Sequence, residues 1–137
     1  MSPDIAPCTN AFGRDRLKSA EAYLQAAATI VTGEEMVESP YWNNAVITNS
    51  VYAGIAASDA ICCFELKAHS SGDDHRQATA QLKKVKHDGP ALAKALADLL
   101  ALKTRAGYGA RPLPDNDVKR AERAAHKLVE AARGRRP

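Results

Sequence analysis

The chain has 137 residues, a formal net charge of +3, abundant alanine and few aromatic residues. This length fits one domain with a core large enough to fold without stabilising cross-links. Its three cysteines, Cys8, Cys62 and Cys63, are odd in number and include an adjacent pair, which argues against a disulfide framework. They also match no zinc-binding spacing, and residues 1–7 lack the basic start and apolar run of a signal peptide. We therefore expect a cytoplasmic protein with no metal site and no cofactor.

The charge is unevenly distributed along the chain. Residues 1–102 carry 9 Lys/Arg and 12 Asp/Glu, whereas residues 103–137 carry 10 and 4. A basic C-terminal segment attracts phosphate groups, although a solvated helix face followed by a charged tail has the same composition.

The first part of the chain predicts an arm followed by a helix. Residues 1–13 contain two prolines and no periodicity, so we expect a flexible arm. One apolar stripe then continues over residues 14–31, as in an amphipathic helix. Gly33 is expected to end that helix in the left-handed conformation, and residues 34–39 form a short acidic connection.

The segment from Tyr41 to about His69 organises the rest of the chain, because it has almost no charge and no internal proline. Ser39 and Pro40 fit the N-cap and first position of a helix, and a helix that is apolar on nearly all sides is a buried one. Its polar residues are too many for a lipid-facing span, so no membrane association is expected. Small residues at positions 53, 54 and 56–58 allow another helix to approach closely, either in this chain or across a dimer interface.

Three further helices are predicted after this segment. Residues 73–85 are expected to form a helix with a weaker pattern. A helix with a leucine stripe follows from Pro90 and ends at Gly107-Tyr108-Gly109, and residues 115–133 form an alanine-rich helix. Residues 135–137 form a basic tail, and no segment shows the alternation of a strand. The sequence predicts an all-α, five-helix up-and-down antiparallel bundle over residues 14–134.

Asp59 is the single charge inside the central helix, among apolar neighbours. A carboxylate in such a place needs a partner if it is buried, so Asp59 is either a functional acid or a paired acid that fixes helix register. A second group of candidates, Lys103, Arg105 and Tyr108, lies at the end of the fourth predicted helix. Arg105 and Lys103 can bind a phosphate or simply complement the helix dipole, and Tyr108 can stack on a base.

Two more groups carry possible chemistry. His75 titrates near neutral pH and is a candidate general base, and Arg76 beside it and Arg111 are candidate binding residues, but a histidine in a first helical turn is commonly just exposed. Basic residues also recur along the last helix, where they fit either an RNA backbone or a solvated face. They are Lys119, Arg120, Arg123, His126, Lys127 and Arg133.

The segment Ser50-Val51-Tyr52-Ala53-Gly54-Ile55-Ala56-Ala57-Ser58-Asp59-Ala60-Ile61, together with Lys103-Thr104-Arg105-Ala106-Gly107-Tyr108-Gly109 and a final alanine-rich helix, resembles HEPN domains. The resemblance covers about residues 14–133 and implies a helical bundle, usually a homodimer. It implies a metal-independent ribonuclease or toxin that often pairs with a small nucleotidyltransferase. The matching motif arginine is Arg105, and the histidine expected four to six residues later is absent, since positions 110–112 hold Ala, Arg and Pro.

Two hypotheses follow from the residues and this resemblance. In the first, the protein acts on or binds RNA or nucleotides, as the toxin-type component of a toxin–antitoxin or defence system. Arg105 then holds a phosphate, Tyr108 positions it, and His75 or Asp59 moves a proton. In the second, it is a non-catalytic dimeric module that binds a partner protein such as a nucleotidyltransferase, and Asp59, Lys103 and Arg105 form a buried ionic cluster that fixes helix register.

Overall fold

The computed structural model describes residues 4–33, 39–72 and 75–137. The expected acidic connection at 34–38 and the acids Asp73 and Asp74 lie outside these residues. The elements follow in the order β1 (Ile5–Pro7), α1 (Asn10–Thr32), α2 (Trp42–Leu66), β2 (Ala68–Ser70), α3 (His75–Leu82), α4 (Gly89–Tyr108) and α5 (Asp115–Arg135). Of the described residues, 76% are helical, which confirms the prediction of an all-α bundle.

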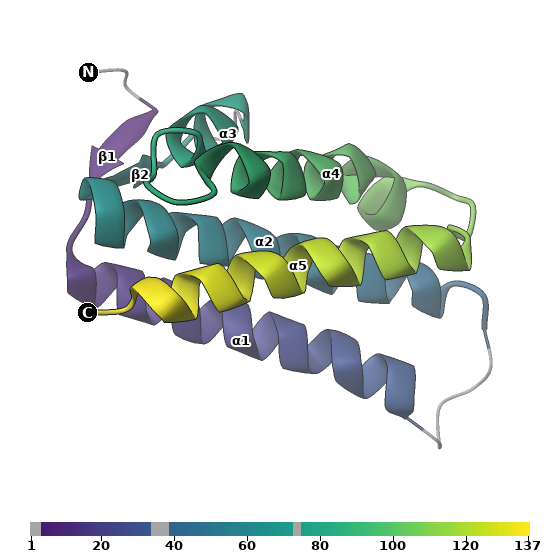
Figure 1. Cartoon of the computed structure of the whole chain (residues 1–137). Coiled ribbons are helices and arrows are strands. Elements are labelled where there is room, and N and C mark those ends of the chain that lie inside the picture. Colours follow the sequence, from purple (N-terminus) through teal and green to yellow (C-terminus); the bar gives the residue numbers. More distant parts are fainter. Residues whose placement is uncertain (1–3, 34–38, 73–74) are drawn as a thin grey trace.

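Four long helices run side by side, with α5 in front of α2, α4 above them and α1 below (Figure 1). Successive long helices run in opposite directions, and the short helix α3 packs beside the first half of α4. The bundle therefore has two distinct ends. We call the end with β1, β2 and the last turns of α2 the disulfide end, and the end with residues 109–114 between α4 and α5 the proline-loop end.

Helix α2 is the core of the bundle, as its sequence predicts. Ala53, Ala56 and Ala57 are fully buried. A Cβ added at Gly54 would lie 2.3 Å from Leu99 Cδ1 of α4, so only glycine allows this approach. The small-residue face is thus covered within the chain, and it gives no support to the expected homodimer.

By length and composition, α2 is the one helix among the described residues that could cross a membrane. However, 72% of its most apolar stretch is buried within the bundle. This finding is weak evidence for a membrane span, because the core helix of a soluble protein has the same length and composition.

Several predicted boundaries are wrong. α1 begins at Asn10, where the Thr9 hydroxyl accepts from the Phe12 N–H at 3.1 Å, so residues 10–13 are helical rather than part of an arm. α2 begins at Trp42, because Ser39 and Pro40 form a turn before it. Gly33 has φ −70° and does not take the left-handed conformation.

The described residues also contain a two-stranded antiparallel sheet that the sequence did not predict. Ile5 pairs with Ser70, Ala6 with His69 and Pro7 with Ala68. Strands of three residues are too short to show an alternating pattern. Their pairing lays the N-terminal segment across the end of α2, so the expectation of an unstructured arm is wrong for residues 5–13.

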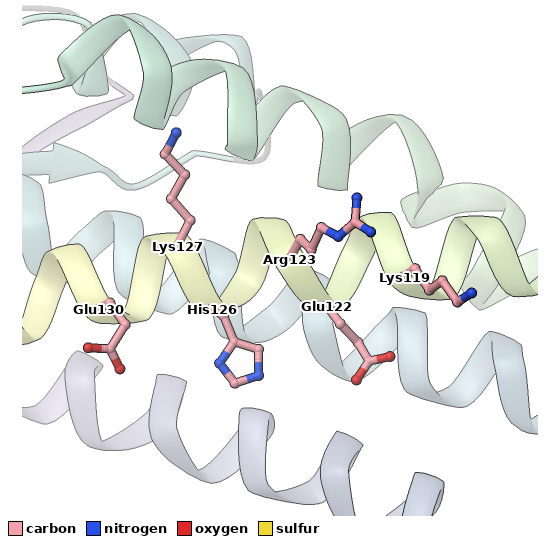
Figure 2. Close-up of a pocket in the computed structure, with 6 residues that line it drawn as sticks. All are labelled: Lys119, Glu122, Arg123, His126, Lys127 and Glu130. Carbon is pink, nitrogen blue, oxygen red and sulfur yellow. The ribbon is translucent and has the colours of Figure 1, made fainter.

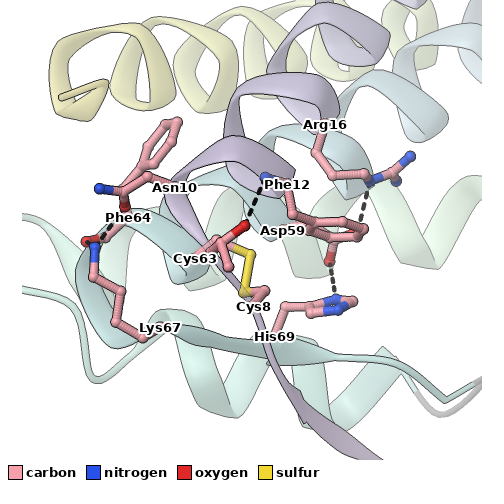
Figure 3. The surroundings of a disulfide bond; sticks show 10 residues. Cys8, Asn10, Phe12, Arg16, Asp59, Cys63, Phe64, Lys67 and His69 are labelled. Atoms are coloured by element: carbon pink, nitrogen blue, oxygen red, sulfur yellow. Dashed lines mark hydrogen bonds and ion pairs between the residues drawn. A yellow bond between two sulfur atoms is a disulfide. The ribbon is translucent and has the colours of Figure 1, made fainter.

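A disulfide between Cys8 and Cys63, with Cα atoms 5.5 Å apart, fastens this segment to α2 (Figure 3). The odd cysteine count argued against a disulfide framework, and that expectation is wrong for Cys8 and Cys63. Cys62 is the cysteine left over, and it is buried. Because disulfides are rare in the cytosol, the argument from cysteines for a cytoplasmic protein loses its basis, and the compartment stays a prediction.

Candidate functional site

Asp59 has partners, and they are not the ones expected from the sequence. The Arg16 Nε donates to its Oδ2 at 3.0 Å, and the His69 Nδ1 lies 3.6 Å from its Oδ1 (Figure 3). The expected cluster of Asp59 with Lys103 and Arg105 is therefore wrong. The physical reason is that α2 and α4 are antiparallel. Asp59 lies near the end of α2 and Lys103 and Arg105 near the end of α4, so they lie toward opposite ends of the bundle.

The Asp59 cluster is largely closed to solvent. The side chains of Asp59 and His69 are each 14% exposed, and the His69 ring packs against Phe12 with centroids 4.9 Å apart. Burial raises the pKa of Asp59, and the charges of Arg16 and His69 oppose that shift. Asp59 lines none of the five main cavities among the described residues. The cluster stabilises the disulfide end and offers no surface to a ligand.

Cys62 has no features of a nucleophile. Burial, and secondarily the Asp59 charge, raises the pKa of its thiol to about 12. Only the thiolate reacts, so this side chain is inert at neutral pH.

Three of the remaining candidates, Lys103, Tyr108 and His75, gather where the second half of α4 meets α2. A cavity of about 140 Å³, which we call the α2–α4 pocket, lies between the two helices. Its lining residues are Thr48, Val51 and Tyr52 from α2, and Lys103, Gly107 and Tyr108 from α4. The structure thus brings Lys103 and Tyr108 together, as the sequence predicted, and adds Tyr52, which the sequence analysis did not single out.

Tyr108 and Tyr52 give this pocket an aromatic rim. Tyr108 is 84% exposed, because it lies in the last turn of α4 and faces away from the core. The Tyr52 ring contacts that of Tyr23 on α1, with centroids 5.4 Å apart. The contact between Tyr52 and Tyr23 thus extends the aromatic side chains from the pocket toward α1. The one sequence feature that could have indicated Tyr52 is that it is an isolated aromatic residue in the middle of α2, where most side chains are small.

His75 reaches the same region from α3. Its Nε2 lies 2.8 Å from the Lys103 Nζ. A lysine ammonium has donors only, so Lys103 donates and His75 carries its proton on Nδ1. In this arrangement the lone pair of the His75 Nε2 is directed at the Lys103 ammonium. Arg76, the next residue of α3, is exposed.

Arg105 and Arg111 belong to a neighbouring cavity at the proline-loop end. This proline-loop cavity of about 500 Å³ is lined by Arg105 and residues 109–114. The Arg105 Nη2 lies 3.9 Å from the Asp117 Oδ2, and its side chain is 59% exposed. Arg105 is thus separated from His75 and Asp59, and the structure does not combine the three into one proton-transfer site.

Two asparagines at the start of α2 hold the proline loop in place. The Asn44 side chain donates to the Arg111 carbonyl at 3.0 Å and accepts from the Leu113 N–H at 2.8 Å. Asn43 donates to the Leu113 carbonyl at 2.9 Å. These bonds satisfy backbone groups of the loop that form no hydrogen bond within a helix. They position Arg111 at the rim of its cavity, and no local pattern of residues predicts them.

No family model matches this chain, and no curated protein matches it at a significant level. The described residues hold no cluster of three or more His, Cys, Asp or Glu side chains that could bind a metal ion.

Proposed function

We propose that this protein binds single-stranded RNA, with a base stacked on Tyr108 or Tyr52 and a phosphate held by Lys103. The observation that carries the proposal is the α2–α4 pocket, where an exposed tyrosine, a second tyrosine and a lysine share one rim. Aromatic side chains interleaved with cations are the means by which proteins bind single strands without a fixed sequence.

The size of the pocket favours a polymer over a small metabolite. Its volume of about 140 Å³ is well below the roughly 300 Å³ at which ligand pockets begin. Such a pocket holds one group of a ligand, and the rest of the ligand lies on the surrounding surface. A base or phosphate of a longer chain fits this description, and the exposed Tyr108 and the proline-loop cavity lie beside it.

His75 and Lys103 favour ribonuclease activity as a second candidate. When a substrate phosphate takes over the Lys103 ammonium, the Nε2 lone pair of His75 can accept a proton in place of the hydrogen bond from Lys103. The 2′-hydroxyl then gives its proton to His75, its oxygen bonds to phosphorus, and the 5′-oxygen leaves with a proton from solvent. Lys103 offsets the negative charge that develops on the phosphate. This chemistry is consistent with the HEPN resemblance, but it uses His75 and Lys103 rather than Arg105.

Binding is tested by fluorescence anisotropy with a labelled oligouridylate of about 15 nucleotides, near the upper site size of a binding domain. Tyr108→Ala should weaken binding by about tenfold, because stacking contributes about 1–3 kcal/mol per base. Tyr41→Ala is the matched control, since this tyrosine is also exposed but lies outside the pocket. Cleavage is followed on the same oligonucleotide without metal, with His75→Gln expected to abolish it while binding remains.

Equal affinities of Tyr108→Ala, Tyr41→Ala and the unmodified protein would contradict the assignment of this pocket. If the folded wild-type protein binds no RNA at all, the proposal is wrong. The alternative, a non-catalytic module for a partner protein such as a nucleotidyltransferase, then becomes the better one.

A further inference from the structure

A basic groove lies between α4 and α5, on the side of α4 away from the α2–α4 pocket. It has a volume of about 280 Å³, and alanines 91, 95 and 124 form its floor. We call it the α4–α5 groove; its charged lining residues are Lys94, Asp98, Arg120, Arg123 and Lys127. Four cations and one acid thus surround a floor of small side chains.

Two of these cations are unpaired among the described residues. Lys94 pairs with Asp98 at 3.1 Å on the same helix, and Arg120 lies 3.5 Å from Asp117. Arg123 and Lys127 are exposed, and no carboxylate of the described residues lies within ion-pair distance of either. A ligand can therefore bind them without first breaking an ion pair.

Helix α5 separates its charges between its two sides. Figure 2 shows Arg123 and Lys127 extending toward α4, whereas Glu122, His126 and Glu130 extend toward α1. Glu130 is paired with Arg133, which also binds Glu21 of α1 at 3.0 Å. Glu122 and Glu130 are thus turned away from the groove, and among the described residues no carboxylate compensates the charges of Arg123 and Lys127 at ion-pair distance.

The groove is connected to the α2–α4 pocket by further cations. Asp117 lies within 4 Å of both Arg120, at the mouth of the groove, and Arg105, on the proline-loop cavity. Lys103, half a turn before Arg105 on α4, lines the α2–α4 pocket. Basic side chains therefore follow one another around the C-terminal end of α4. Along α5, Arg123 and Lys127 are one turn apart, about 6 Å, which is comparable with the distance between successive phosphates of an extended strand.

We propose that one RNA strand occupies both places: its base enters the α2–α4 pocket, and its phosphate backbone passes around the end of α4 into the α4–α5 groove. Arg105 and Arg111 contact the backbone at the turn, and Arg123 and Lys127 contact it within the groove. This inference rests on the proposed RNA binding and deepens it. An acidic helix fits less well, because a floor of alanines gives such a helix no deep apolar pocket to fill.

The test compares two labelled probes, a trinucleotide that can fill only the pocket and the oligouridylate of about 15 nucleotides. The double variant Arg123→Ala/Lys127→Ala should bind the longer probe more weakly and the trinucleotide unchanged. Its slope of log K against log salt concentration should fall by about 1.4, since each phosphate contact on a single strand contributes about 0.7. Arg14→Ala/Lys18→Ala is the matched control, with the same spacing, exposure and charge change on α1; its slope should equal that of the wild type.

The outcomes separate this inference from the proposed function. If Tyr108→Ala weakens both probes but the double variant keeps the wild-type slope, the pocket binds RNA and the groove does not. If the double variant loses slope while Tyr108→Ala binds normally, the groove binds RNA and the pocket assignment fails. If the wild type binds neither probe but captures a glutamate-rich helical peptide through Arg123 and Lys127, the groove serves a protein partner and the RNA path is overturned.

Discussion

The two ends of the bundle each contain an arginine–aspartate pair in which the aspartate is largely buried, and the pairs differ in the exposure of the arginine and in the distance between the charges. At the disulfide end, Arg16 and Asp59 are 3.0 Å apart, with side chains 29% and 14% exposed. At the proline-loop end, Arg105 and Asp117 are 3.9 Å apart, and the arginine is 59% exposed. A strand, a histidine and a disulfide cover the first pair, whereas the second lies at the edge of an open cavity.

This difference shows that ionic residues serve stability at one end and are available for binding at the other. Burial at the disulfide end strengthens each electrostatic interaction but leaves no room for a ligand. At the proline-loop end, solvent screens the interaction, so the pair contributes little to folding. The cations there can change partners at small cost, which is a property of a phosphate-binding surface.

The largest effect is expected from breaking the disulfide. Cys8→Ala should lower the free energy of unfolding by about 4 kcal/mol, because the bridge closes a loop of 55 residues. Urea unfolding with and without dithiothreitol measures this effect. The reductant should destabilise the wild type and Cys62→Ala but leave Cys8→Ala unchanged. A wild type that is insensitive to reductant would show that the two ends do not differ in this covalent constraint.

A second prediction concerns the pH dependence that Asp59 imposes. Because its folded pKa is raised, the folded state keeps a proton that the unfolded chain has already lost. The stability that this provides is fully present below the unfolded pKa and is lost as the pH rises through the folded pKa. Relative to Asp59→Asn, the wild type should therefore lose stability from about pH 4 upward.

Urea unfolding at a series of pH values measures this difference. Both proteins should carry His69→Gln, so that the measured difference reports on Asp59 alone. A difference between the two that is constant with pH would mean that Asp59 titrates normally and is not held in a closed environment.

The helices were predictable because their signals are local. The apolar stripe of α4 and the alanine-rich pattern of α5 each follow from residues within one helix. The burial of α2 followed in the same way from its composition. The boundaries failed where the chain uses a turn, as at Ser39 and Pro40, in place of the N-cap that the residues allowed.

The ionic partners and the disulfide were not predictable, because they depend on how distant segments align. Cys8 and Cys63 are 55 positions apart, and the strand that brings them together has three residues. The position of Asp59 in an apolar helix indicated that this carboxylate needs a partner. However, nothing in the sequence distinguishes Arg16 from the other arginines as that partner. The pairing of His75 with Lys103 depends on the same information, namely which helices are neighbours and in what register.

The smallest effect is expected at Arg105. Arg105→Ala should change the free energy of unfolding by less than about 0.5 kcal/mol, because the Arg105 side chain is 59% exposed and the buried Asp117 keeps Arg120 at 3.5 Å. Arg16→Ala at the other end should cost about 2–3 kcal/mol, since it leaves Asp59 buried without its main partner. Urea unfolding of both variants measures the difference in the free energy of unfolding. The RNA affinity should show the reverse pattern, because Arg105→Ala should weaken binding and Arg16→Ala should leave it unchanged. If Arg105→Ala were as destabilising as Arg16→Ala, both pairs would be structural, and the proline-loop end would have no cation to spare for a phosphate.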